Sequence, residues 1–190
     1  MYSRASRIPS IGRQWLRLLA AAALAALAGG CTPAWWGKTL TDLPAMGHRN
    51  WIVVADSAYP AQSRPGIETI YTDANQLELV AELLRALDHM RHVRPVVYLD
   101  SELPYVSDLD APGIGAYREQ LKRVLGSRPI NTLPHEEIIA KLDKAGETFR
   151  ILILKTNMTL PYTSVFLELD CGYWTPEAEQ RLRQAIKGGK

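Results

Sequence analysis

The sequence has 190 residues, of which 47% are hydrophobic and 22% are charged, enough for one domain with a substantial core. Its formal net charge is +2, but residues 1–30 hold four arginines and no acid, so the remainder of the chain carries a charge of −2. Neither value gives an electrostatic reason to expect nucleic acid as a partner, and we expect none.

The N-terminus has the layout of a secretory signal peptide. Arginines are spread over residues 4–17, and residues 18–28 form an apolar run of Leu and Ala that is too short for a membrane span. Ala28-Gly29-Gly30 then puts small residues directly before Cys31, which looks like the lipobox of bacterial lipoproteins, although Ala28 stands where Leu is usual. The pattern predicts a signal peptide over residues 1–30, cleaved before Cys31. The alternative is ordinary cleavage in which Cys31 has no special role.

Acylation of Cys31 would place the protein in the bacterial cell envelope, anchored to a lipid membrane on the periplasmic side. Cys171 would then be the only free thiol, so no intramolecular disulfide would form and the core would be stable without one. No second hydrophobic span follows, and we expect the remaining chain to fold as a soluble domain on its tether.

The first half of the remaining chain alternates short strands with one long helix. Residues 31–45 contain Pro and two Trp and are interpreted as a lipidated tether with a first turn or short helix. The β-branched run at 51–55 predicts a buried strand, and the alternation at 67–71 predicts another. Apolar residues at helical spacing then predict a helix over 76–91.

The second half continues the same alternation. A strand at 95–99 leads into an acidic, Pro-containing loop at 100–112, and a helix at 116–125 ends at the glycine that follows it. The pattern then predicts a helix at 134–144, strands at 149–154 and 164–169, and an exposed helix at 176–187. Strands that alternate with helices favour an α/β layered domain, which we assign to residues 46–175, followed by a C-terminal helix and tail at 176–190.

Polar side chains flank the first predicted strand. Asp56 follows it directly, at the end where ligand sites gather in open α/β sheets, and a carboxylate there is suited to holding two hydroxyl groups. The alternative is that Asp56 caps the turn after the strand. His48 precedes the same strand, so a strand length of about 17 Å separates the two residues unless the chain folds back.

Two later segments carry similar residues. His135 begins a predicted helix, where it is either a hydrogen-bonding group for a ligand or a solvent-facing residue. Tyr162, in the polar loop before the last strand, either offers a ring face and a hydroxyl to a ligand or packs at the strand entrance. His89 and His92 have the spacing of metal ligands but no third ligand nearby, and their place at a helix end favours a structural role. We therefore expect no metal site.

Together, these segments resemble the RbsD/FucU family of D-ribose pyranases and L-fucose mutarotases. The family's Gly-His-x-Asp stretch, hydrophobic strand and following Asp-Ala and Pro correspond to residues 47–50, 51–55 and 56–61. Its later helix-start His, strand and Tyr-containing loop correspond to His135, residues 149–154 and Pro161-Tyr162-Thr163-Ser164. The order and spacing agree over most of residues 44–174.

The resemblance implies an RbsD-like, three-layer α/β/α fold with a mixed central sheet, assembled into a homo-oligomer with sites near subunit contacts. It implies that His48 is the catalytic proton donor, and that a monosaccharide such as ribose or fucose binds at Asp56, His135, Tyr162, Thr163 and Ser164. Interconversion of anomers or ring forms opens the sugar ring by general acid–base steps, for which His is suited near neutral pH. No cofactor or metal is needed.

The sequence departs from the family pattern at two positions. Asn50 replaces the acid after His48, which weakens the partner that would orient and charge the imidazole. Ser164 replaces an Asn in the last loop and loses one amide. These changes keep open a non-catalytic, monosaccharide-binding envelope lipoprotein as the alternative to a sugar isomerase, and an envelope protein that binds no sugar as a third candidate.

Overall fold

The computed structural model describes residues 33–189, so Cys31 and the predicted signal peptide lie outside the described residues. The chain divides into two units, residues 1–37 and 38–190. Of the first unit, the described part is the beginning of helix α2 (Ala34–Asp42), where the rings of Trp35 and Trp36 meet edge to face with centroids 5.7 Å apart. The sheet and the candidate site belong to the second unit.

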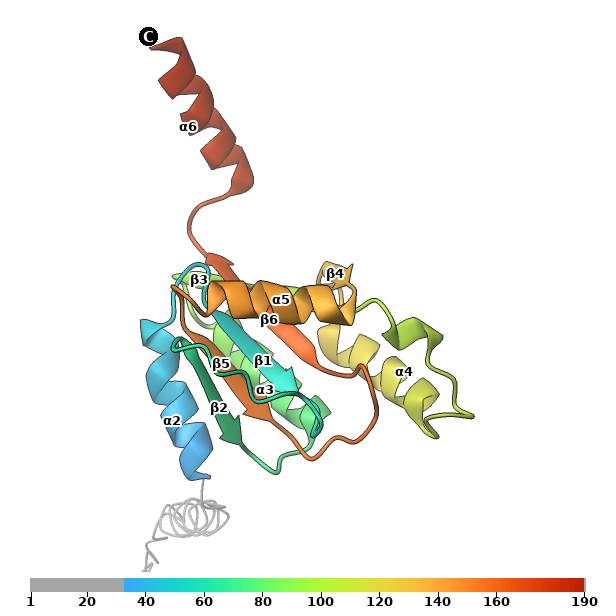
Figure 1. The fold of residues 1–190 in the computed structure, drawn as a ribbon. Helices are drawn as coiled ribbons and strands as arrows, with labels where there is room; N and C mark the ends of the chain where they lie inside the picture. The colour runs from blue at the N-terminus through green and yellow to red at the C-terminus, as the bar shows by residue number, and fades with distance from the viewer. Residues whose placement is uncertain (1–32, 190) are drawn as a thin grey trace, which may run out of the picture. The chain divides into compact units, whose positions relative to one another are not determined.

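Within residues 38–189, six strands form one mixed sheet in the order β2-β5-β1-β6-β3-β4 (Figure 1). The strands are β1 (Trp51–Ala55), β2 (Ile67–Tyr71), β3 (Val93–Asp100), β4 (Ile130–Leu133), β5 (Ile151–Lys155) and β6 (Val165–Cys171). β6 is antiparallel to both of its neighbours, and the other adjacent pairs are parallel. The carboxyl ends of β1 to β5 therefore meet the start of β6 at one side of the sheet, which we name the carboxyl edge. The opposite side is the amino edge.

Helices cover both faces of the sheet. The helices that follow α2 are α3 (Gln76–Asp88), α4 (Ile114–Leu125), α5 (His135–Ala145) and α6 (Pro176–Gly188), with the 3-10 turns η1 (Leu43–Ala45) and η2 (Leu103–Tyr105). α5 lies on one face, and α3 and α4 lie on the other (Figure 1). The prediction of a three-layer α/β/α fold with a mixed central sheet is therefore confirmed.

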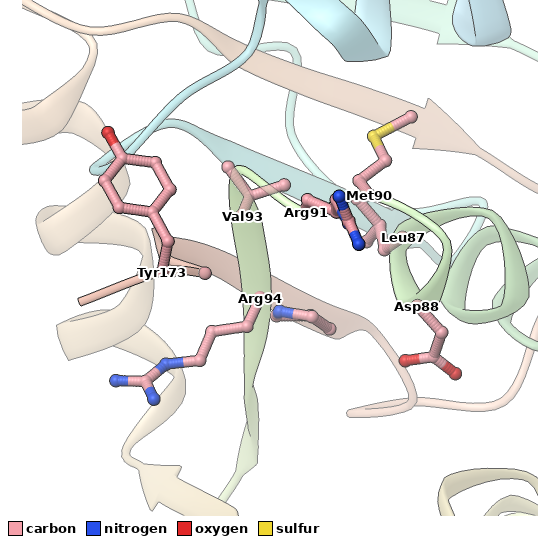
Figure 2. Close-up of a pocket in the computed structure, with 9 residues that line it drawn as sticks. Leu87, Asp88, Met90, Arg91, Val93, Arg94 and Tyr173 are labelled. Carbon is pink, nitrogen blue, oxygen red and sulfur yellow. The ribbon is translucent and has the colours of Figure 1, made fainter. Parts of the chain in front are cut away.

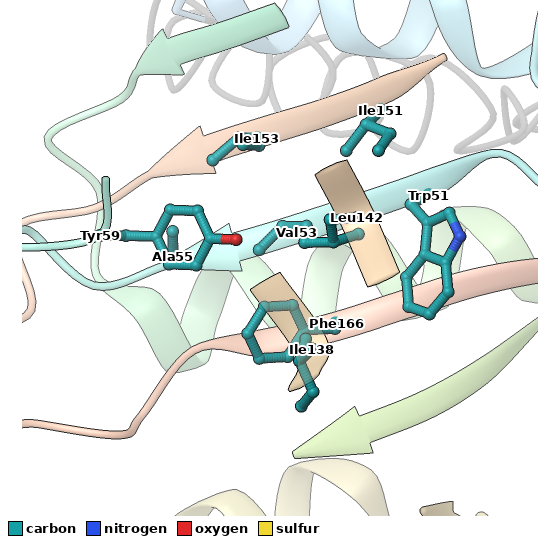
Figure 3. Packing of buried hydrophobic residues seen from close by; sticks show 9 residues of the cluster. All are labelled: Trp51, Val53, Ala55, Tyr59, Ile138, Leu142, Ile151, Ile153 and Phe166. Atoms are coloured by element: carbon teal, nitrogen blue, oxygen red, sulfur yellow. The ribbon is translucent and has the colours of Figure 1, made fainter. Parts of the chain in front are cut away.

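The central strand β1 is buried on both faces, which accounts for its unbroken apolar sequence. Alternate residues of β1 point toward α5, where they pack with Ile138 and Leu142 (Figure 3). Each large apolar side chain buried in this way stabilises the fold by about 1.5–3 kcal/mol. This packing fixes the start of α5, where His135 lies, relative to the end of β1, which Asp56 follows.

β4 is the one strand that the sequence did not predict. Its residues are Ile-Asn-Thr-Leu, of which the first three are exposed, so that no burial pattern marks the strand. Thr132 and Pro134 also favour a helix start, which makes the segment resemble a helix N-terminus. The other strands and helices are present as predicted, with ends that differ by a few residues.

The two ends of this unit differ in burial. Residues 38–45, predicted as part of the tether, are folded, because Thr39 and Leu43 are buried. α6 has no buried residue, in line with the prediction of an exposed terminal helix. Among the helices of residues 33–189, none combines the length and the apolar character needed to cross a membrane.

Candidate functional site

Asp56 lies at the carboxyl edge, directly after β1, and is 8% exposed. Its Oδ1 accepts a hydrogen bond from the N–H of Ala58 (2.9 Å), and its Oδ2 accepts one from the hydroxyl of Ser164 (2.8 Å). Asp56 therefore caps the turn after β1 and is also held from the start of β6. Because each carboxylate oxygen has two lone pairs, both oxygens can still accept a hydrogen bond from a ligand.

The strand β4 brings His135 to the carboxyl edge. β3 and β4 are parallel, with Asp100 opposite Leu133. His135 follows two residues later, and its Nδ1 lies 3.1 Å from Oδ1 of Asp100. The backbone N–H of His135 donates to the Glu102 carboxylate at 3.0 Å, which satisfies an amide that the start of α5 would leave unpaired. Both partners of His135 come from the end of β3 and the segment that follows it.

Asp100 is a candidate site residue that the sequence analysis missed. It is 1% exposed, which is unusual for a carboxylate, and its Oδ2 is the one buried side-chain polar atom in the described residues without a hydrogen-bond partner. Burial raises the pKa of the Asp100 carboxyl to about 6, although the nearby His135 opposes the shift. Repulsion from Glu102 and Asp56 acts in the same direction as burial, so these groups share one electrostatic environment.

Tyr162 lies in the loop between β5 and β6 and is 37% exposed. Its φ of 56° is a left-handed conformation, which costs a non-glycine residue on the order of 1 kcal/mol. Its ring meets that of His135 edge to face, with centroids 5.5 Å apart. Strain of this kind at an accessible aromatic ring is typical of a binding loop.

The hydroxyls of Thr163 and Ser164 are buried and engaged within the protein. Thr163 donates to the carbonyl of Leu160 at 2.7 Å, and Ser164 donates to Asp56. The Thr163 carbonyl also lies 2.8 Å from the Tyr117 hydroxyl, which donates to it. Both residues therefore hold the loop and Asp56 in place. Contact between a ligand and either hydroxyl stays a prediction.

His48 lies at the amino edge, before β1, and its side chain is 52% exposed. Its Nδ1 lies 3.2 Å from Oδ1 of Asp170, near the end of β6. Partial burial acts to raise the pKa of the Asp170 carboxyl, but hydrogen bonds from Arg94 and from the N–H of Cys171 outweigh this effect and lower it. His48 thus has an anionic partner that the sequence analysis missed.

Asn50 was expected to leave His48 with a weakened partner. That expectation is wrong, because Asp170 supplies a carboxylate to the imidazole. The Asn50 side chain holds the turn instead, because its Oδ1 accepts from the N–H of Gly47 (2.7 Å) and its Nδ2 donates to the carbonyl of Arg150 (3.2 Å). The carboxylate beside His48 comes from Asp170, which reaches it through the antiparallel pairing of β1 and β6. No local sequence pattern signals such a contact.

Open cavities lie at the amino edge, and two of them are close to His48 or to Arg94, the partner of Asp170. One has a volume of about 490 Å³, and its lining includes His48, Arg94, Asp170 and Trp174. The other, of about 620 Å³, is formed by the end of α3, the start of β3 and residues that follow β6 (Figure 2). Both volumes fall in the range of small-molecule sites, so there is room for a sugar beside His48.

β1 separates the two groups of candidate residues. It has five residues, which span about 17 Å at about 3.3 Å per residue. The structure therefore brings together Asp56, His135, Tyr162, Thr163 and Ser164, and it leaves His48 at the opposite edge of the same chain. A pocket that contains all the predicted groups needs two copies of the chain.

The two remaining histidines have structural roles. His89 is the C-cap of α3, and Nε2 of His92 lies 3.1 Å from the carbonyl oxygen of Met46. Within residues 33–189, no group of three or more His, Cys, Asp or Glu side chains is arranged to hold a metal ion.

Comparison with known proteins identifies the family of the chain. The sequence model of the RbsD / FucU transport protein family matches residues 38–172. Similar solved structures include RbsD from Bacillus subtilis complexed with D-ribose, with 20% identity over 74% of this chain and 95% of that chain and a TM-score of 0.48. They also include the fucose mutarotase from Streptococcus pneumoniae in complex with L-fucose, with 24% identity over 73% of this chain and 92% of that chain and a TM-score of 0.47.

A third similar structure is FucU from Bifidobacterium longum, with 18% identity over 73% of this chain and 94% of that chain and a TM-score of 0.48. No curated protein matches the sequence significantly. The family match covers more than half of the sequence, including every strand of the sheet and both groups of candidate residues. The chain therefore belongs to the RbsD/FucU family.

Proposed function

We propose that the protein is a monosaccharide isomerase of the mutarotase or pyranase type, which interconverts anomers or ring forms of a sugar such as ribose or fucose. Membership of the RbsD/FucU family supports this proposal. The observation that carries it is the grouping of Asp56, His135 and Tyr162, a carboxylate, an imidazole and an accessible phenol, at one edge of the sheet.

These three groups suit the recognition of a sugar. The ring of Tyr162, 37% exposed, offers an apolar face to the C–H groups of a sugar ring. Asp56 accepts hydrogen bonds from hydroxyls, and the imidazole of His135 can donate a hydrogen bond or accept one. Because Ala58 and Ser164 already fix the Asp56 carboxylate, sugar binding requires little further ordering of that side chain.

In the proposed reaction, His48 donates a proton to the ring oxygen of the sugar. Asp170 accepts a hydrogen bond from the Nδ1–H of His48, which leaves Nε2 as the nitrogen that exchanges a proton with the sugar. The guanidinium group of Arg94 in turn donates a hydrogen bond to the Asp170 carboxylate.

The complete site would form between two copies of the chain. His48 belongs to the amino edge, whereas Asp56, His135 and Tyr162 belong to the carboxyl edge. The cavity of about 490 Å³ beside His48 is open, so a second copy can cover it with its carboxyl edge. We therefore propose a homo-oligomer in which the subunit contact encloses the sugar.

The rate of anomer exchange tests this function. Saturation-transfer NMR of ribose, fucose and galactose, with the full-length protein in mild detergent, should show faster exchange for at least one of these sugars. His48→Ala should lower the acceleration by about 100-fold, the size of a general acid contribution. His89→Ala, which changes an exposed histidine at the end of α3, is the matched control and should keep the full rate. A His48→Ala protein as fast as the unchanged one would remove His48 from the reaction.

A non-catalytic monosaccharide-binding protein is the second candidate. The burial of Ser164 favours it, because the hydroxyl at the position of the family's Asn is engaged by Asp56 and offers no amide to a sugar. This candidate predicts sugar binding in calorimetric titration without any acceleration of exchange. An absence of binding for every sugar would favour an envelope protein that uses the fold as a scaffold.

Export and lipid anchoring are a separate part of the proposal. Their support is the sequence around Cys31, a residue that lies outside the described part of the chain. Radioactive palmitate supplied to growing cells should label the protein, and Cys31→Ser should abolish the label. A protein that is never labelled would contradict the anchor and leave the proposed activity of the domain unaffected.

A further inference from the structure

Ring opening moves two protons, and His48 accounts for one of them. As the bond between the anomeric carbon and the ring oxygen breaks, its electron pair goes to the ring oxygen, which takes the proton from His48. The anomeric hydroxyl loses its proton in the same step, and a carbonyl group forms at the anomeric carbon. A base at the carboxyl edge must accept this second proton and return it when the ring closes.

The carboxyl edge offers two groups that could act as this base. Both oxygens of Asp56 already accept hydrogen bonds, from Ala58 and Ser164, which hold this carboxylate in a fixed position suited to binding hydroxyl groups. The side chain of His135 is 24% exposed, and its Nδ1 is engaged by Asp100. Within residues 33–189, no hydrogen bond engages its Nε2, which leaves this nitrogen available to a ligand.

We propose that Asp100 is a positioning residue that holds His135 by its Nδ1–H, so that Nε2 stays unprotonated and accepts the anomeric proton of the sugar. The inference rests on the proposed function. A carboxylate accepts hydrogen bonds and does not donate them, so a neutral His135 paired with Asp100 carries its single proton on Nδ1. The imidazolium that forms during the reaction is then stabilised by the carboxylate 3.1 Å away.

Two contacts hold the ring of His135, and a third holds its backbone. Asp100 engages Nδ1, Glu102 accepts the backbone N–H at 3.0 Å, and the Tyr162 ring stands at 89° to the imidazole. The second oxygen of Asp100 is buried without a partner, an arrangement that weakens a fold. A carboxylate placed at such a cost is expected where it serves a neighbouring functional group.

The position of the imidazole proton tests this inference without any measurement of activity. Long-range ¹H–¹⁵N correlation spectra of the full-length protein at about pH 8 should show His135 with a protonated Nδ1 and an unprotonated Nε2. His135→Gln assigns the signals, and Asp100→Asn should shift the population toward the other tautomer. A proton on Nε2 of His135 in the unchanged protein would overturn the inference, whether or not the protein accelerates sugar exchange.

Kinetics provide the second test. Asp100→Asn should lower the exchange rate by about 10- to 100-fold while sugar affinity changes little, because the base is misdirected but the binding groups remain. Asp110→Asn, the same change at an exposed position in the loop after β3, is the control and should alter neither quantity.

The outcomes separate the inference from the proposed function. If the unchanged protein accelerates exchange and Asp100→Asn keeps its full rate, the role of Asp100 is overturned and the isomerase function stands. If the unchanged protein accelerates no sugar, the isomerase function fails, and the tautomer of His135 alone decides whether Asp100 positions the imidazole.

Discussion

A carboxylate buried away from water costs free energy unless both of its oxygens are paired. Asp100 is 1% exposed, and its Oδ2 has no hydrogen-bond partner among the described residues. Its Oδ1 lies 3.1 Å from Nδ1 of His135, so half of the carboxylate is engaged and half is not. At this residue the fold gives up stability for a fixed orientation of the neighbouring imidazole.

This cost predicts that Asp100→Asn stabilises the fold in a pH-dependent way. Burial raises the pKa of Asp100 from 3.8 to about 6, so the folded protein binds this proton more tightly than the unfolded chain. The contribution of the group to stability is therefore fully present below the unfolded value of 3.8 and is lost as the pH rises through about 6. Asn suffers no such loss, and the variant should gain about 1–3 kcal/mol over the unchanged protein at neutral pH and above.

Urea unfolding of both proteins, at a pH below 4 and again near 8, measures this difference in the free energy of unfolding. The gain should be small in acid and should grow with pH. A difference of the same size at both pH values would show that ionisation of Asp100 does not burden the fold.

At the scale of elements, the strands that position the site differ in how well the sequence predicts them. β1 and β5 are almost wholly buried, so each appears as an unbroken apolar run. β4 exposes three of its four residues and pairs with β3 alone, so neither burial nor alternation marks it. Because β4 sets Leu133 opposite Asp100, missing this strand also left the contact between Asp100 and His135 unpredicted.

The direction of β6 sets a second limit on prediction. Its apolar residues predict a strand, but they do not reveal that it runs antiparallel to both neighbours. That direction puts Ser164 at the carboxyl edge beside Asp56 and Asp170 at the amino edge beside His48. Polar residues at strand ends were thus predictable as site candidates, whereas the carboxylates that orient the two histidines depend on strand pairing.

The helix α5 carries His135 at its first position and depends on packing to hold it. Leu142 is fully buried in a cluster with residues of β1, β5 and β6 (Figure 3). Leu142→Ala removes these contacts and leaves a cavity, so the free energy of unfolding should fall by about 2–5 kcal/mol in urea denaturation. Lys144→Ala, at a side chain 81% exposed in the same helix, should change it by less than about 0.5 kcal/mol. Equally small losses in both variants would contradict the packing of α5 on the sheet.

At the scale of the whole folded unit, the candidate residues lie at opposite edges of one sheet. The contact proposed here joins the amino edge of one copy to the carboxyl edge of the next, two different surfaces. Repeated around an axis, a head-to-tail contact of this kind closes into a ring, in which each contact encloses one complete site. A single copy would hold two incomplete halves, so the proposed activity would depend on assembly.

Subunit complementation is the consequence that most directly distinguishes a shared site from a site within one chain. His48→Ala removes the amino-edge group and Asp56→Ala removes the carboxyl-edge group, so each variant alone should lose most of the acceleration. When the two variants are produced together and assemble at random, roughly a quarter of the contacts join two unmutated halves, and exchange should recover to about that fraction of the unchanged rate. Saturation-transfer NMR of the mixed assembly measures the recovery. In a site built within one chain, every copy would carry one of the two mutations, and mixing would recover nothing.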